Sequence, residues 1–206
     1  MSSPVLPESP SSSNSVTILG VLASGSGSNF EAIAFAIENG ELQAKIALVI
    51  YNEPDAFAKQ RAEKFGIPAI LVNHRDYKSR QSLDRAIIDI LKQYHVDLVI
   101  MAGWMRIVTQ VLIDAFPERI LNIHPSLLPS FKGIHAIEQA FNYGVKVTGC
   151  TVHLLSLEVD SGKILKQAAV PVLPDDTLED LQKRIQVQEH IIYPEAIAEY
   201  SDRLTK

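Results

Sequence analysis

The chain has 206 residues, of which 47% are hydrophobic and 21% charged, as in a globular α/β domain with a substantial core. A net charge of −5 argues against a general nucleic-acid-binding surface, and no apolar run is long enough to cross a membrane. The single cysteine, Cys150, excludes an intrachain disulfide and a Cys-rich metal site. Since one cysteine fits a reducing compartment, we expect a cytoplasmic protein.

Buried strands and amphipathic helices alternate along most of the chain. Residues 1–15 are rich in Ser and Pro and lack Lys and Arg, so we expect a disordered tail rather than a targeting peptide. Nearly continuous apolar runs predict buried strands, and periodic apolar positions predict helices. The strands are expected at 16–24, 44–51, 69–72, 98–102, 120–124, 147–155 and 164–170, and the helices at 28–39, 55–65, 79–94, 109–116, 136–143 and 177–200.

This order of elements predicts the fold class. Regular strand–helix alternation in the first half is typical of an α/β protein with a doubly wound, mostly parallel, Rossmann-like sheet. The last two strands follow each other through a short turn, so one edge of the sheet should be antiparallel or mixed. No repeat or second domain is evident, and residues 16–206 are interpreted as one domain.

A glycine-rich loop follows the first strand. Residues 24–29 (SGSGSN) connect that strand to a helix start, where glycines let the backbone approach a ligand and free N–H groups attract an anion. The spacing of Ser28 and Glu31 predicts a capping box. The loop lacks the Gly-Lys-Ser/Thr ending of a Walker loop, and Phe30 occupies the third glycine position of a dinucleotide fingerprint. A single phosphate monoester fits better, although a plain Gly/Ser turn remains open.

Two polar residues stand at the end of the strand at 120–124. Asn122 and His124 are two apart, so their side chains point to the same face, and Pro125 ends the strand. In open parallel sheets, ligands bind at the carboxyl ends of the strands. An amide there can donate to a developing oxyanion and an imidazole can move a proton near neutral pH. The alternative is a strand end with a satisfied polar pair.

Other polar residues have both a structural and a functional interpretation. Asp160 lies in a turn at 158–162, where Asp and Gly are common, but its carboxylate could instead orient His124 and favour the charged imidazole. Gln186 and Glu189 share one face of the last helix and could hold a diol or simply face solvent. Arg80 opens a helix and is either a surface residue or a partner for an acidic ligand.

A zinc site built from histidines is the metal-dependent alternative. Four residues could contribute to it: His124, His135, His153 and Asp160. No spacing typical of zinc ligands links them, so we expect no metal.

Five segments together resemble the glycinamide ribonucleotide formyltransferase family. They are ASGSGSNFEAI at 23–33, MAGWMRI at 101–107, LNIHPSLLPSFKG at 121–133, EVDSGKIL at 158–165 and RIQVQEHIIYPEAI at 184–197. The resemblance extends over residues 16–200 and implies the formyltransferase fold. It also implies transfer of the formyl group of 10-formyltetrahydrofolate to the amine of N1-(5-phospho-D-ribosyl)glycinamide, in purine biosynthesis.

The resemblance implies a role for individual residues. The catalytic residues would be Asn122, His124 and Asp160. The ribonucleotide would bind Gly25, Gly27, Ser28, Asn29, Gln186 and Glu189. The folate, as co-substrate, would bind Arg80, Met105, Arg106, Ile107, Val108, Asn122, Ser156 and Asp160. The implied partners are small molecules, without metal, nucleic acid or membrane, and both a monomer and a homodimer remain open.

The chain departs from the family pattern at two positions, and other functions compete. Trp104 stands where Phe is more usual, and Ile137 where some members carry a second histidine. The rivals are methionyl-tRNA formyltransferase, formyltetrahydrofolate deformylase and a nucleotide-binding or NAD-dependent protein without formyl chemistry. We do not expect the first, because its tRNA-binding C-terminal domain has no room in an acidic chain that ends at Lys206. The phosphate loop argues against the deformylase, and Phe30 argues against a dinucleotide.

Overall fold

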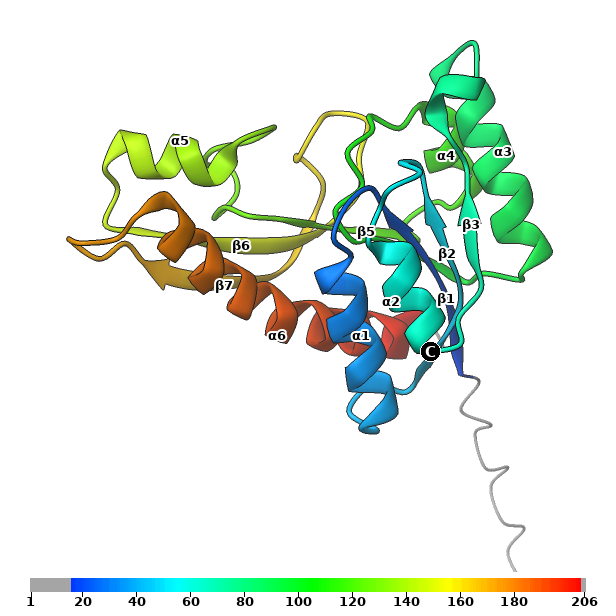
Figure 1. Ribbon diagram of the computed structural model, residues 1–206, viewed down its shortest axis with the longest axis horizontal. Helices are drawn as coiled ribbons and strands as arrows, with labels where there is room; N and C mark the ends of the chain where they lie inside the picture. Colours follow the sequence, from blue (N-terminus) through cyan, green and yellow to red (C-terminus); the bar gives the residue numbers. More distant parts are fainter. Residues whose placement is uncertain (1–15, 205–206) are drawn as a thin grey trace, which may run out of the picture.

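The computed structural model describes residues 16–204, and the predicted tail at 1–15 lies outside this range. The described residues form one seven-stranded sheet in the order β3-β2-β1-β4-β5-β6-β7 (Figure 1). Its strands are β1 (Thr17–Ala23), β2 (Ala44–Tyr51), β3 (Ala69–Leu71), β4 (Leu98–Met101), β5 (Ile120–His124), β6 (Val147–Leu154) and β7 (Ile164–Pro171). β1 to β5 pair in parallel, whereas β6 and β7 are antiparallel to their neighbours. The predicted doubly wound sheet with a mixed edge is therefore confirmed.

Helices cover both faces of the sheet. They are α1 (Ser28–Glu38), α2 (Ala58–Lys64), α3 (Arg80–Gln93), α4 (Gln110–Ala115), α5 (Ala136–Tyr143) and α6 (Leu178–Leu204), with a 3₁₀ turn η1 (His74–Asp76). α1, α2, α5 and α6 pack on one core and α3 and α4 on the other. Each fully buried side chain, such as Phe30 or Ile87, contributes about 1.5–3 kcal/mol to that packing. None of the helices within residues 16–204 combines the length and apolarity needed to span a bilayer.

The long helix α6 is anchored beneath the middle of the sheet. Tyr193 is fully buried, and its hydroxyl lies 3.1 Å from the carbonyl oxygen of Met101 in β4 and 3.0 Å from that of Leu121 in β5. One hydroxyl hydrogen serves both carbonyls, which belong to the last residue of β4 and the second residue of β5. α6 also lies along β6 and β7 (Figure 1). The helix is thereby fixed against the strands that carry the polar residues of interest.

Three local predictions were wrong. The capping box does not form, because Gly27 is the N-cap of α1 with φ 71° and Glu31 pairs instead with Arg61 and Lys64. α2 begins at Ala58 rather than Asp55, because the preceding residues form a turn in which the Ala56 N–H bonds the Glu53 carbonyl.

The last helix also runs beyond its predicted end. α6 continues to Leu204 through Pro194, which lacks an N–H and so removes one intrahelical hydrogen bond. Burial of Tyr193, Pro194 and Ile197 against the sheet outweighs that loss.

Candidate active site

The loop after β1 has the backbone geometry of an anion cradle. A Cβ at Gly27 would lie 2.8 Å from the Cα of Ala58, and the φ of Gly27 is 71°, so only glycine fits there without strain. Among residues 16–204, the backbone N–H groups of Gly27, Ser28 and Asn29 find no hydrogen-bond partner. These free donors stand at the N-terminus of α1, where the helix dipole adds partial positive charge.

All six residues expected to bind the ribonucleotide surround one cleft of about 300 Å³. Two hydrogen bonds join the loop to α6 across it: Gln186 Nε2 donates to Ser28 Oγ at 2.9 Å, and Asn29 Nδ2 donates to Glu189 Oε2 at 3.0 Å. Burial raises the pKa of Glu189, although the bond from Asn29 opposes this shift. The Asn29 Oδ1 atom is buried and makes no hydrogen bond within the described part of the chain. The cleft thus holds both spare donors and spare acceptors.

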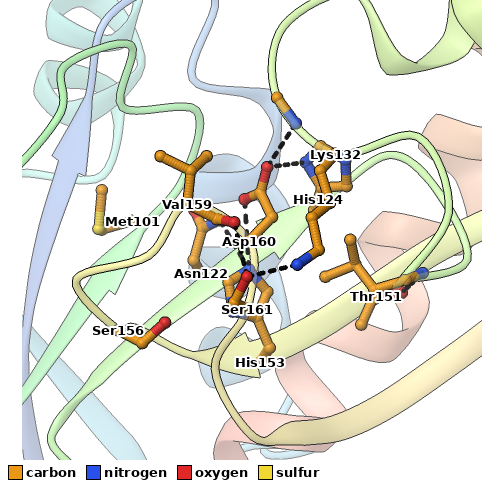
Figure 2. Close-up of polar contacts among 12 residues, drawn as sticks. Met101, Asn122, His124, Lys132, Thr151, His153, Ser156, Val159, Asp160 and Ser161 are labelled. Atoms are coloured by element: carbon orange, nitrogen blue, oxygen red, sulfur yellow. Dashed lines mark hydrogen bonds and ion pairs between the residues drawn. The ribbon is translucent and has the colours of Figure 1, made fainter.

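Asn122, His124 and Asp160 lie close together (Figure 2). His124 is 5% exposed, and its Nδ1 atom lies 3.3 Å from Asp160 Oδ2, while its Nε2 atom lies 2.8 Å from the Phe131 carbonyl oxygen. Both ring nitrogens therefore face acceptors, an arrangement that an imidazolium satisfies completely. Ile123 and Pro125, the chain neighbours of His124, line the cleft, whereas the three residues themselves stand beside it.

Asp160 is held in place by several donors. Its φ is 49°, a left-handed conformation that Asp tolerates, and the Gly133 N–H donates to its Oδ2 atom at 2.8 Å. Burial by itself would raise the pKa of Asp160. Contacts with His153, the Gly133 N–H and the His124 ring outweigh burial and hold this pKa below its usual value of 3.8. The carboxylate is therefore kept charged beside His124.

The structure adds two residues to which the sequence analysis gave no catalytic role. The antiparallel register of β5 and β6 places His153 opposite Asn122 and Thr151 opposite His124. His153 is fully buried, with its Nδ1 atom 2.8 Å from the Leu154 carbonyl oxygen. Its Nε2 atom lies 3.1 Å from Asn122 Nδ2 and 3.7 Å from Asp160 Oδ1, so the ring stands between the amide and the carboxylate.

Thr151 secures the loop after β5. Its hydroxyl donates to the Ser126 carbonyl at 2.7 Å and accepts from the Leu128 N–H at 3.1 Å. Strand alternation in the sequence puts Thr151 and His153 on one face, but the strand that they meet is known only from the pairing. The sequence alone therefore does not place Thr151 and His153 beside His124 and Asn122.

The residues expected to bind the folate are more dispersed. Met105 alone among them lines the cleft, and it is 73% exposed. Ile107 is exposed and Val108 buried, whereas Arg106 is intermediate. Arg80 is exposed and has no ion-pair partner among residues 16–204, and Ser156 donates to the Glu158 carbonyl. The described residues contain no group of three or more His, Cys, Asp or Glu side chains arranged to hold a metal ion.

Known proteins share both the sequence and the fold. A family model described as "Formyl transferase" matches residues 18–197. The chain is 42% identical to the phosphoribosylglycinamide formyltransferase of Bacillus subtilis, over 86% of this chain and 91% of that protein. It is 45% identical to the trifunctional purine biosynthetic protein adenosine-3 of Bos taurus over 86% of this chain, but spans only 18% of that longer protein.

A solved structure gives the same result. The chain superposes on glycinamide ribonucleotide transformylase 1 from Symbiobacterium toebii with a TM-score of 0.89 and 48% identity. The match covers 91% of this chain and 88% of that one.

Proposed function

The chain belongs to the formyl transferase family, and on that premise we propose that it transfers the formyl group of 10-formyltetrahydrofolate to the amine of N1-(5-phospho-D-ribosyl)glycinamide, a step of de novo purine biosynthesis. The observation that carries the proposal is the cleft, which begins at a phosphate cradle and ends beside Asn122, His124 and Asp160. A hydrolase that passes the formyl group to water would have no use for that cradle. The proposal assigns the activity to one domain, residues 16–206.

The cleft provides a site for each part of the ribonucleotide. The free N–H groups of Gly27, Ser28 and Asn29, together with Gly25, hold the phosphate monoester. Gln186 and Glu189 hold the ribose, because an amide and a carboxylate on one helix face can bond adjacent hydroxyls. With the phosphate and ribose fixed, the glycinamide amine extends towards the residues beside Ile123 and Pro125.

Three side chains carry out the transfer. Asn122 donates a hydrogen bond to the oxyanion that develops when the amine attacks the formyl carbon, and loss of such a donor typically lowers the rate by about 10²–10³-fold. His124 stabilises the same charge and moves a proton towards the leaving folate nitrogen. Asp160 keeps the imidazole oriented through its 3.3 Å contact with Nδ1. Holding both substrates side by side supplies much of the remaining acceleration.

The folate would supply the formyl group from the other side of this trio. Residues 105–108 would line the pterin pocket, with the exposed side chains of Met105 and Ile107 as apolar contacts. Residues 156–160 would close over it, with Ser156 and Asp160 at its ends. The exposed Arg80 has no ion-pair partner among residues 16–204, so it would pair with a carboxylate of the folate tail.

One assay tests the proposal. Purified protein is incubated with 10-formyltetrahydrofolate, and release of tetrahydrofolate is followed with and without glycinamide ribonucleotide. We expect release that depends on the amine acceptor and a formylated ribonucleotide as the product. Release at the same rate without acceptor would identify a hydrolase, and no release in either case would refute formyl chemistry.

A further inference from the structure

Arg61 contacts the loop at residues 24–29, on the side that faces α2. It lies on α2, and its Nε atom donates to the Ser26 carbonyl at 2.8 Å. Its guanidinium also pairs with Glu31 on α1 and lies 5.1 Å from the centre of the Phe57 ring. The side chain is 22% exposed. Arg61 thus connects α2, α1 and the loop with one planar group whose donors point in fixed directions.

The bond to Ser26 sets the orientation of a peptide plane. In a trans peptide, the carbonyl and the next N–H point in opposite directions. Because the Ser26 carbonyl points to Arg61, the N–H of Gly27 points away from α2, towards the cleft that Gly27 lines. The preceding plane is fixed in the same way, since the Ala58 N–H donates to the Gly25 carbonyl at 3.1 Å. α2 therefore turns two successive loop carbonyls away from the phosphate.

We propose that Arg61 is a positioning residue for phosphate binding, which acts by orienting the Ser26–Gly27 peptide rather than by touching the ligand. This inference rests on the proposed function, because it takes the ribonucleotide phosphate as the occupant of the loop. The positive charge of Arg61 is paired with Glu31, so its effect on a dianion is exerted through geometry rather than through an unpaired charge.

Lys64 provides a matched control. It lies one turn along α2, and its Nζ atom is 3.3 Å from the other carboxylate oxygen of Glu31. It makes no hydrogen bond to the loop within the described residues. Arg61→Met and Lys64→Met therefore each remove one positive charge and one ion-pair partner of Glu31. Only Arg61→Met also removes the donor to the Ser26 carbonyl.

The experiment measures how much the phosphate contributes to turnover. For each variant, kcat/KM is compared between glycinamide ribonucleotide and its dephosphorylated riboside, and the ratio reports the phosphate contribution. We expect Arg61→Met to lower this ratio roughly tenfold, the usual effect of one misdirected hydrogen bond to a charged group, without change in KM for the folate. Lys64→Met should keep the wild-type ratio, and Arg61→Lys should recover part of the loss.

Three results would overturn the proposal: an unchanged ratio in Arg61→Met, an equal loss with ribonucleotide and riboside, or the same loss in Lys64→Met. If Arg61→Met does not fold, Arg61→Lys provides the test, because an ammonium lacks the fixed second donor of the guanidinium. A wild-type ratio in Arg61→Lys would then contradict the inference. If the wild-type protein shows no acceptor-dependent transfer, the proposed function fails separately. Calorimetric binding of inorganic phosphate to the same variants then tests Arg61 by itself.

Discussion

The two nitrogens of His124 are held by groups of different kinds. Nδ1 faces the carboxylate of Asp160, which is itself fixed by the Gly133 N–H. Nε2 faces only a backbone carbonyl, that of Phe131, in the loop that follows β5. A substrate oxygen can replace that carbonyl without separating charges, whereas replacing the carboxylate would leave a buried charge unpaired. We therefore propose Nε2 as the nitrogen that exchanges a proton with the reacting groups.

Removal of this imidazole should nearly abolish turnover while leaving the cleft intact. We expect His124→Ala to lower kcat by about 10²–10⁴-fold, the range for loss of a general acid–base group, with ribonucleotide binding near normal. Steady-state kinetics and calorimetry measure the two effects. His135→Asn is the control, because His135 is exposed and its left-handed backbone accepts Asn. Wild-type turnover in His124→Ala would remove this residue from the mechanism.

Asp160 should stabilise the fold in a pH-dependent way. Its pKa in the folded protein is lowered from 3.8, so its stabilisation is fully present above pH 3.8 and is lost as the pH falls through the folded-state pKa. Asp160→Asn should therefore be less stable than wild type at neutral pH, by on the order of 1–2 kcal/mol, and the difference should shrink below pH 3.8. Urea unfolding across this range measures it; a difference independent of pH would argue against the charged contacts.

Ionisation of Glu189 should affect the stability of the fold in the opposite direction to ionisation of Asp160. Burial raises its pKa above 4.5, so the folded state is favoured below pH 4.5 and this advantage is lost as the pH rises through the folded-state pKa. We expect Glu189→Gln to melt at a higher temperature than wild type at neutral pH and at the same temperature below pH 4.5. The same variant should bind the ribonucleotide roughly tenfold more weakly. A lower melting temperature at neutral pH would contradict the buried charge.

At the scale of elements, the start of α2 shapes the phosphate loop. Its first residue, Ala58, bonds the Gly25 carbonyl and leaves no room for a side chain at Gly27. The turn before α2 determines where Ala58 lies, so residues 53–57 support the loop although they are distant from it in sequence.

Gly27→Ala should weaken ribonucleotide binding without affecting the folate. The new Cβ would clash with Ala58, and the left-handed backbone adds about 1–2 kcal/mol. Gly40→Ala has the same kind of backbone strain but open space around its Cβ, so it isolates the effect of the close approach. We expect a loss of more than about tenfold in ribonucleotide affinity for Gly27→Ala only. Equal losses for both ligands would mean that the loop is merely structural.

Elements defined by their own residues could be predicted from the sequence, whereas contacts between elements could not. Apolar runs place β2 and β5, and strand alternation places Asn122 and His124 together. The contact between Asn122 and His153 could be identified only from the β5–β6 register. The role of Arg61 could not be predicted, because its contact with Ser26 depends on the turn that makes α2 begin at Ala58 rather than at residue 55.

At the scale of the whole molecule, ligand binding should stabilise segments from both ends of the chain. The cleft draws on the loop after β1, the end of β5 and helix α6. Ribonucleotide at 100 times its Kd should add about 2.7 kcal/mol, or a rise in Tm of roughly 5–10 °C for a domain of this size. Thermal melting with the dephosphorylated riboside is the control and should give a smaller rise. No shift with either ligand would mean that the folded protein does not bind the ribonucleotide.

Helix α6 carries Tyr193, Gln186 and Glu189, and this affects when the newly translated chain can bind substrate. Asn29 in the loop at 24–29 is translated 160 residues before Glu189, its partner on α6. A nascent chain that lacks α6 has neither the Tyr193 bond to β4 and β5 nor the far wall of the cleft. Substrate capture is therefore postponed until α6 has been translated, and a product terminated before α6 would be inert rather than partly active.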